Sequence, residues 1–159
     1  MLDVLVLTPD DWQLWRQLRL AALAEAPGAF GSTVAEWSGS GDTQQRWRTR
    51  LTSVALNLVL KADDEPVGMV SATAPSTDGE VELMSLWIAP AGRGRGAGDE
   101  AVRQVAAWAR GQHPGHAVVL SVKTDNRQAR ALYARHGFVD AGPSTDDPDG
   151  RRMRRHASR

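Results

Sequence analysis

Arg93-Gly94-Arg95-Gly96-Ala97-Gly98 is the segment around which the rest of this sequence can be arranged. It follows an apolar run from Val81 to Pro90, which is typical of a buried strand ended by a proline. An amphipathic run from Asp99 to Arg110 comes next and predicts a helix. A glycine-rich turn between a strand and a helix leaves backbone N–H groups unpaired at the positive end of the helix dipole. We therefore expect this turn to bind phosphate.

The residues that the turn lacks narrow the choice of phosphate ligand. No Gly-Lys-Ser/Thr follows the glycines, so the lysine and the magnesium-binding hydroxyl of a P-loop are missing. The alternating Gly94, Gly96 and Gly98 also fit the dinucleotide fingerprint poorly, because no early βαβ unit surrounds them. The turn by itself leaves the ligand open.

Composition limits the class of protein. A chain of 159 residues fits a single domain, 1–159, with an adequate core. The 19 basic and 19 acidic residues balance, so we expect no general attraction to nucleic acid or membrane. The absence of cysteine excludes disulfides, a thiolate zinc site and a catalytic cysteine. Met1–Leu7 has no basic leader and no apolar stretch reaches membrane-spanning length, which predicts a cytoplasmic protein.

Hydrophobic periodicity predicts the element order β-α-α-β-β-β-α-β-α-β-β. The predicted strands are 4–7, 54–61, 67–73, 81–89, 116–122 and a last hairpin within 138–155. The first predicted helix is capped by Thr8 and runs to about Glu25, and the second starts near Asp42. The last is capped by Asp125 and ended by Gly137.

Two motifs resemble those of the GNAT superfamily of acyl-CoA N-acyltransferases. Arg-x-x-Gly-x-Gly at 93, 96 and 98, after the strand Glu-Leu-x-x-Leu-Trp-Ile, is similar to the family's acyl-CoA-binding motif. Asn126-x-x-Ala129-x-x-Leu132-Tyr133-x-x-His136-Gly137-Phe138 is similar to its second motif, N-x-x-A-x-x-L-Y-x-x-x-G-F. The resemblance implies an α/β (mixed α+β) GNAT fold. Its mostly antiparallel sheet of six or seven strands would be splayed between strands 4 and 5 and flanked by about four helices.

The same resemblance implies acetyl-CoA as the acyl donor. Its pyrophosphate would lie on backbone N–H groups of Arg93, Gly94, Arg95, Gly96, Ala97 and Gly98. The pantetheine would fill the splay like a missing strand. It would bond to the backbone of Leu86, Trp87 and Ile88, with Asn126 on its other side.

Charges around the turn act in both directions. Arg93 and Arg95 can add positive charge near the phosphates, although Arg95 fits a solvated loop arginine equally well. Asp99 and Glu100 suit the helix dipole, but they would weaken acetyl-CoA binding if their side chains faced the pyrophosphate.

Two side chains are candidates for the chemistry. Tyr133, the only tyrosine, matches the family tyrosine that donates to the thioester sulfur, and a phenol stays protonated at pH 7. The alternative is a core aromatic. Glu82 is the candidate base, since desolvation in an apolar strand raises a carboxyl pKa. The alternative is a carboxylate paired with an arginine, in which case Ser85 or the backbone could pass the proton.

The remaining signals are weaker. The acceptor groove of this fold would lie between Ala29–Trp37 and Asp140–Gly150. The acidic hairpin loop would favour a cationic amine such as a polyamine, an aminoglycoside-like sugar, or a lysine or N-terminal amine of a protein; a merely polar turn is the alternative. We expect no metal site, because the histidines lack acidic ligands at a useful spacing. Arg151–Arg155 fits an edge strand better than a nucleic-acid patch.

Six tryptophans are present. Trp15, Trp87 and Trp108 fit the core, whereas Trp12, Trp37 and Trp47 are assigned to a pocket or a dimer surface.

The sequence therefore predicts an N-acetyltransferase that moves an acetyl group from acetyl-CoA directly to a primary amine of a small molecule or a protein. The alternatives are a non-catalytic acyl-CoA-sensing module of the same fold and an unrelated phosphate-binding regulator. The acceptor, the acyl length and a homodimer stay open.

Overall fold

The computed structural model describes residues 2–26 and 33–157, and its elements follow the predicted order. The strands are β1 (Leu2–Val6), β2 (Leu56–Ala62), β3 (Glu65–Ala72), β4 (Glu80–Ile88), β5 (Ala117–Lys123), β6 (Val139–Pro143) and β7 (Gly150–Arg155). The α-helices are α1 (Trp12–Glu25), α2 (Gln44–Ser53), α3 (Ala97–Gln112) and α4 (Arg127–Arg135). Short 3-10 turns are η1 (Pro9–Asp11), η2 (Ala35–Trp37), η3 (Gly39–Gly41) and η4 (Pro90–Gly92).

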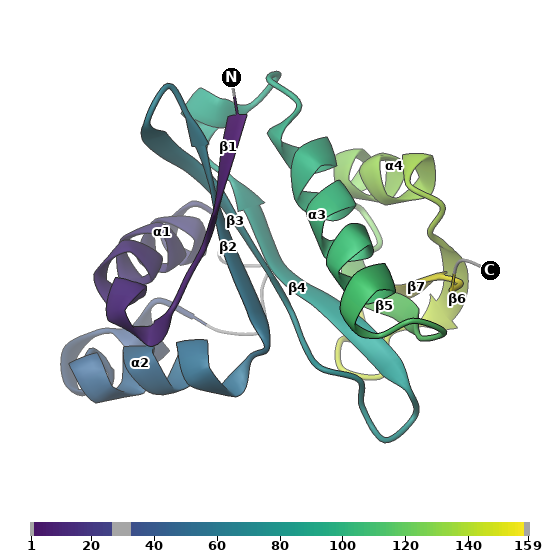
Figure 1. The fold of residues 1–159 in the computed structure, drawn as a ribbon, viewed down its shortest axis with the longest axis horizontal. Coiled ribbons are helices and arrows are strands. Elements are labelled where there is room, and N and C mark those ends of the chain that lie inside the picture. Colours follow the sequence, from purple (N-terminus) through teal and green to yellow (C-terminus); the bar gives the residue numbers. More distant parts are fainter. Residues whose placement is uncertain (1, 27–32, 158–159) are drawn as a thin grey trace.

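The strands form one seven-stranded sheet in the order β1-β2-β3-β4-β5-β7-β6 (Figure 1). Every neighbouring pair is antiparallel except β4 and β5, which run parallel. These two strands pair only from Glu80 to Glu82 against Ala117 to Val119. The expected mixed fold, with a mostly antiparallel sheet opened between strands 4 and 5, is confirmed.

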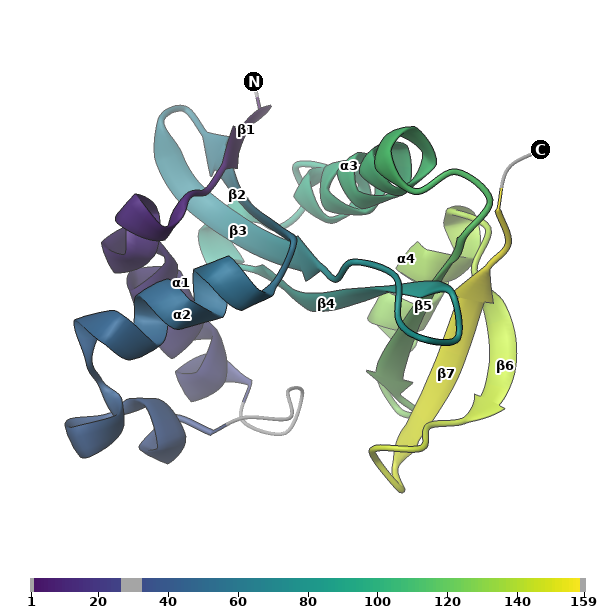
Figure 2. The same cartoon turned by 60° about the horizontal axis from the view of Figure 1, so that its bottom comes forward.

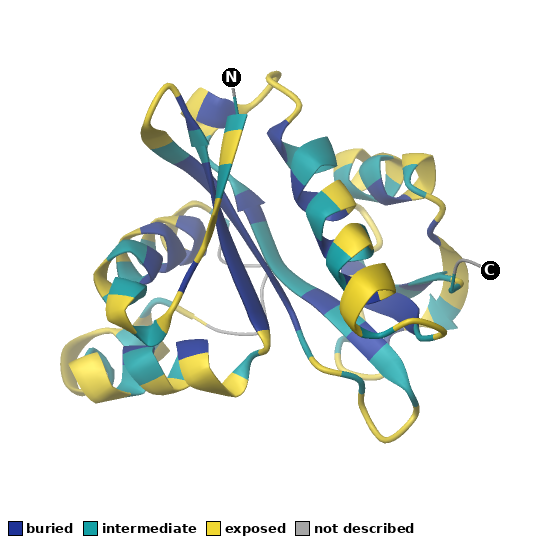
Figure 3. Cartoon of the chain, viewed as in Figure 1, coloured by how far each residue is buried: buried dark blue, intermediate teal, exposed yellow. Residues whose placement is uncertain are grey.

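Two apolar clusters hold helices to the two faces of this sheet. Val81 and Leu83 of β4 belong to the cluster that contains the inner side of α3, whereas Trp15 of α1 and Trp47 of α2 belong to the cluster on the other face. Figure 2 shows α1 and α2 on one side of β2 to β4 and α3 on the other. Figure 3 shows the buried residues gathered where the helices meet the sheet.

The prediction that Trp47 lies at a surface or pocket is wrong. Trp47 is fully buried, and its ring lies 4.5 Å from that of Trp37. Its indole Nε1 donates to Asp42 at 2.8 Å, so the one polar atom of the ring is satisfied without water. Hydrogen bonds from Arg16 and then Trp47 lower the pKa of Asp42 to about 2.

The helix ends follow the expected cap chemistry with one exception. Thr8 and Asp11 form a capping box at η1, and Gly137 has a φ of 87° just beyond α4. Asn126, not Asp125, caps α4, because its side chain accepts a hydrogen bond from the backbone N–H of Ala129 at 3.1 Å.

The prediction of an edge strand at 151–155 is also wrong, because β7 lies between β5 and β6. Three of its arginines donate to carboxylates on β4 and β6. Arg152 and Arg154 both donate to Glu80 of β4, and Arg151 donates to Asp140 of β6. Among the described helices, none is long and apolar enough to cross a lipid bilayer.

Candidate active site

The glycine turn presents free backbone donors. Gly94 and Gly96 have φ values of 77° and 78°, and a Cβ built on either would meet nothing within 4 Å. Among the described residues, no backbone carbonyl accepts from the N–H groups of 94–99. Ala97 and Gly98 lie in the first turn of α3 rather than in the loop. The result is an open cradle of N–H groups at a helix N-terminus, which suits a phosphate.

Gly98 has a second role. A Cβ at this position would lie 3.2 Å from Leu132 of α4, which is tighter than ordinary van der Waals contact. The third glycine of the motif therefore lets α4 pack against the start of α3.

The acidic residues after the turn are held away from the N–H groups. Asp99 accepts from His136 at 2.7 Å and from Arg135 at 3.2 Å. Glu100 accepts from Arg103 at 3.0 Å and from Gln104 at 2.9 Å. Their charges are thus paired along α3 and toward α4, and the weaker phosphate binding considered from the sequence is not favoured.

Arg93 and Arg95 differ in what they contact. Arg93 donates through Nε to the carbonyl of Ile88 at 3.1 Å and forms an ion pair with Glu25 of α1. It thereby attaches the turn to the end of β4 and to α1. Arg95 is half exposed and contacts Asp63 at 3.5 Å, which fits a solvated loop arginine.

A β-bulge interrupts β4 where the sheet opens. Ser71 pairs with Met84 and Met69 with Trp87, so one β3 residue, Val70, stands opposite two residues of β4. Ser85 takes a φ of 58°, a left-handed conformation that is costly for a non-glycine residue. The bulge shifts the alternation of side chains, and Trp87 packs against the α1–α2 side of the sheet while Leu86 and Ile88 pack toward α3.

A pocket occupies the splay between β4 and β5. It is lined by Leu83, Met84, Ser85, Leu86, Leu120, Ser121, Val122, Lys123, Asn126, Ala129 and Tyr133. Leu86 is the only one of the three predicted β4 contacts that lines it, while Trp87 and Ile88 pair with β3 nearby. The structure thus brings Leu86, Asn126 and Tyr133 together in one pocket.

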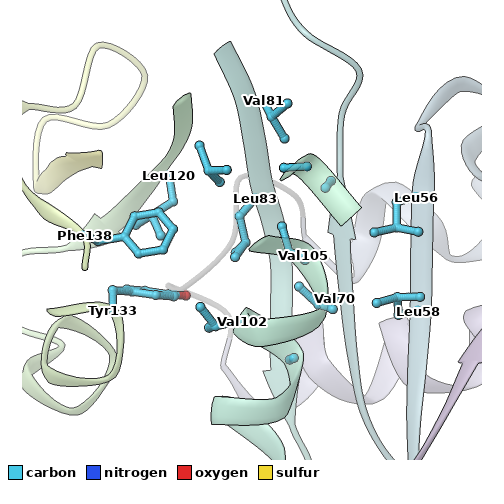
Figure 4. Close-up of a cluster of buried hydrophobic side chains, with 14 of the residues drawn as sticks. Leu56, Leu58, Val70, Val81, Leu83, Val102, Val105, Leu120, Tyr133 and Phe138 are labelled. Carbon is cyan, nitrogen blue, oxygen red and sulfur yellow. The ribbon is translucent and has the colours of Figure 1, made fainter. Parts of the chain in front are cut away.

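Tyr133 reaches this pocket from α4. It is 7% exposed, and its ring packs edge-on against Phe138 at 5.8 Å. Figure 4 shows its hydroxyl pointing toward the side on which Leu83 and Val102 lie. Burial raises the pKa of the Tyr133 phenol far above its ordinary value, so the hydroxyl keeps its proton at neutral pH.

Glu82 lies at the last position at which β4 pairs with β5, where the splay begins. Its carboxylate makes no hydrogen bond or ion pair within the described part of the chain, because Arg152 donates to Glu80 instead. Burial raises the pKa of Glu82, Arg152 opposes the rise, and Asp146 and Glu80 add to it. The arginine-paired alternative thus applies to Glu80 rather than to Glu82.

A polar cluster beside the bulge was not found from the sequence. Arg50 of α2 donates to Asn57 at 2.9 Å, to Ser71 at 3.2 Å and to Ser85 at 3.4 Å. Ser71 also donates to Asn57 at 2.7 Å. These residues come from four separate elements without motif spacing, so no pattern in the sequence marks them.

The predicted acceptor groove is only partly described. Residues 27–32, which include the first four residues of its first loop, lie outside the described residues. In the other loop, Asp140 pairs with Arg151 at 2.7 Å and Asp147 with Lys123 at 2.5 Å. Within residues 2–26 and 33–157, no group of three His, Asp or Glu side chains is placed to hold a metal ion.

The chain belongs to the acetyltransferase (GNAT) family, whose model matches residues 15–138. The N-acetyltransferase 9-like protein of Caenorhabditis elegans is 32% identical over 121 residues, with 65% of this chain and 59% of that protein covered. The chain therefore spans less than two thirds of that relative.

Solved structures share the fold at low identity. The spermidine N-acetyltransferase of Vibrio cholerae, in complex with CoA and spermine, has a TM-score of 0.78 at 18% identity, covering 98% of this chain and 95% of that one. The PaiA N-acetyltransferase of Thermoplasma acidophilum, in complex with coenzyme A, has a TM-score of 0.77 at 14% identity, covering 98% and 99%. These likenesses establish the fold and, with the family, the class of acyltransferases.

Proposed function

We propose that this protein is an acetyl-CoA-dependent N-acetyltransferase that transfers the acetyl group directly to a primary amine. The observation that carries the proposal is the splay between β4 and β5, whose pocket is lined by Leu86, Asn126 and Tyr133. The cradle of free N–H groups at 94–99 follows directly after β4 and η4. One sheet contains all seven strands, so we also propose that 1–159 acts as one domain.

The donor would be held mostly by backbone. The N–H groups of 94–98 would bind the pyrophosphate. Arg93, whose own N–H donates to Pro90, would fix the turn rather than contact phosphate. The edge of β4 beyond Glu82 has no strand partner on its β5 side, so its backbone is open to strand-like addition of the pantetheine near Leu86 to Ile88. The side-chain oxygen of Asn126 accepts the capping hydrogen bond of α4, so its amide N–H₂ group can donate to the ligand.

The reaction requires one bond to form and one to break. The amine nitrogen attacks the thioester carbonyl carbon, a C–N bond forms, the C–S bond breaks, and the thiolate of CoA leaves. Glu82 would accept the proton that the amine loses, directly or through water. Its raised pKa makes it a stronger base than an exposed glutamate.

Tyr133 would stabilise the leaving sulfur by donating a hydrogen bond. A phenol with a raised pKa is a weaker acid than a thiol of pKa about 8.5, so full transfer of its proton to the thiolate is uphill. A hydrogen bond to a developing negative charge is nevertheless strong in a buried pocket. The absence of cysteine supports direct transfer over a cysteinyl acyl-enzyme.

The burial of Tyr133 also supports a second candidate function, an acyl-CoA-sensing module without turnover, because a buried phenol loses its proton less readily. Calorimetric titration with acetyl-CoA, using ATP and NAD as controls, tests the site that both share. One-site binding of acetyl-CoA alone is expected. Binding of ATP in competition with acetyl-CoA, or no binding of acetyl-CoA, would contradict the proposed donor site.

A further inference from the structure

Arg50 is a half-buried cation at the opening of the splay. It projects from the last turn of α2 onto the sheet, with its guanidinium 4.9 Å from the ring centre of Trp15. One of its hydrogen bonds goes to Ser85, which also lines the splay pocket. Arg50 is therefore placed beside the point where the donor thioester would lie.

The charge of Arg50 is not matched by an acid. Its hydrogen bonds all go to neutral oxygens, those of Asn57, Ser71 and Ser85, and no carboxylate among the described residues pairs with it. Its charged neighbour is Arg19 of α1, which is 8% exposed. Burial lowers the pKa of each guanidinium to about 10, so both stay positive at neutral pH. A half-buried cation such as Arg50 is stabilised when an anion contacts it.

A negative region lies farther along the same strand. Glu82 precedes Ser85 by three residues, which is roughly 10 Å in an extended strand. Asp146 of the last hairpin loop lies near enough to raise the pKa of Glu82. The opening of the splay thus has an acidic end at Glu82 and Asp146 and a basic end at Arg50.

We propose that the acceptor is an amine that also carries a carboxylate, with the ammonium end toward Glu82 and the carboxylate on Arg50. This inference rests on the proposed N-acetyltransferase function and names the substrate class of the same site. Nη2 of Arg50 already donates to Ser71 and Ser85, so the remaining Nε–H or Nη1 hydrogen would donate a charge-assisted hydrogen bond to a carboxylate oxygen. The positive charge of Arg50 disfavours polyamines, because their second ammonium would face it. The proposed acceptor therefore differs from the cationic amine expected from the acidic hairpin loop.

The test compares acceptors that differ only at the far end. Linear ω-amino acids of two to six carbons, their carboxamides and diamines of equal length are assayed for release of CoA thiol. The acids are expected to exceed their amides in kcat/KM by about tenfold or more, mainly through KM, because a charged hydrogen-bonded pair is lost in the amide. Equal rates for acids and amides, or faster diamines, would overturn this inference but leave the proposed function standing. No thiol release with any amine would overturn both.

Two variants test whether Arg50 causes the preference for acids over amides. Arg50→Gln is expected to remove the preference for acids over amides, while Arg48→Gln, on the same helix and paired with exposed Asp10, should keep it. An unchanged preference in Arg50→Gln, with acetyl-CoA binding intact, would contradict the assignment. If Arg50→Gln does not fold, the comparison of acids, amides and diamines with the wild-type protein still tests the proposed substrate class. Valerate is expected to compete with the amino acid acceptor and valeramide is not; equal inhibition by both would overturn the proposal.

Discussion

The carboxylate of Asp99 lies 2.7 Å from Nε2 of His136, and this contact joins the first turn of α3 to the end of α4. Arg135 reaches the same carboxylate at 3.2 Å. Asp99 therefore links α3 to α4 and does not face the glycine turn where we propose that the pyrophosphate binds.

Asp99→Asn should lower the free energy of unfolding by about 1 kcal/mol at neutral pH, because the charge-assisted hydrogen bonds weaken in a partly exposed setting. Hydrogen bonding from His136 and then Arg135 lowers the pKa of Asp99 in the folded protein. Its contribution is fully present above the ordinary Asp pKa of about 3.9 and is lost as the pH falls through the lower folded value. Urea unfolding of both proteins should therefore give a difference at pH 7 that disappears in acid. A difference that grows in acid would contradict this account.

The fold could be predicted well because local sequence patterns largely determine the strands, the helices and their ends. The apolar run before Arg93 and the amphipathic run after it define β4 and α3 directly. The position of β7 was missed because a strand's neighbours depend on the whole chain, and β7 inserts between β5 and β6. The burial of Trp47 was missed because its partner Asp42 becomes visible only in three dimensions.

The site was predicted only in part. Asn126 and Tyr133 stand in a spaced motif on one helix, and they do line the splay. The bulge at Ser85 has no glycine or proline to mark it in the sequence, and the contact from Arg50 to Ser85 joins residues 35 positions apart. Arg50 itself is one of many arginines in the sequence, and only its environment distinguishes it.

Tyr133→Phe should lower kcat on the order of 10²-fold, since one hydrogen bond to the leaving sulfur is lost. The affinity for acetyl-CoA should stay near that of the wild type, because the ring still packs against Phe138. Steady-state kinetics with calorimetry as the binding control measure both. Unchanged turnover would show that Tyr133 is only a core aromatic.

Glu82→Gln should lower kcat/KM on the order of 10²-fold and abolish the fall in rate on the acid side of the pH profile. That limb should lie above the ordinary glutamate pKa of about 4.3, since burial raises the pKa of Glu82. Glu80→Gln is the matched control on the same strand. The Glu80→Gln variant should keep the fall in rate on the acid side, but at lower pH. The reason is that Glu80 raises the pKa of Glu82, whereas Arg152, which Glu80 holds, lowers it. A limb that survives in Glu82→Gln would exclude this residue as the base.

Gly96→Ala should weaken acetyl-CoA binding and lower the free energy of unfolding by about 1–2 kcal/mol, because Gly96 has a φ of 78° at the N-cap of α3. Gly111→Ala is the control, since Gly111 lies in α3 with open space around it and should gain about 0.5–1 kcal/mol. Calorimetry and thermal unfolding measure the two effects. Equal acetyl-CoA affinity in both variants would argue against the turn as the phosphate site.

The most direct measurement is the amine-dependent release of CoA thiol from acetyl-CoA, with mass spectrometry of the acceptor. The account predicts thiol release in equal amount to N-acetylated amine, and much slower release by Tyr133→Phe. One-site binding of acetyl-CoA without thiol release for any amine would contradict it and identify a binding module instead.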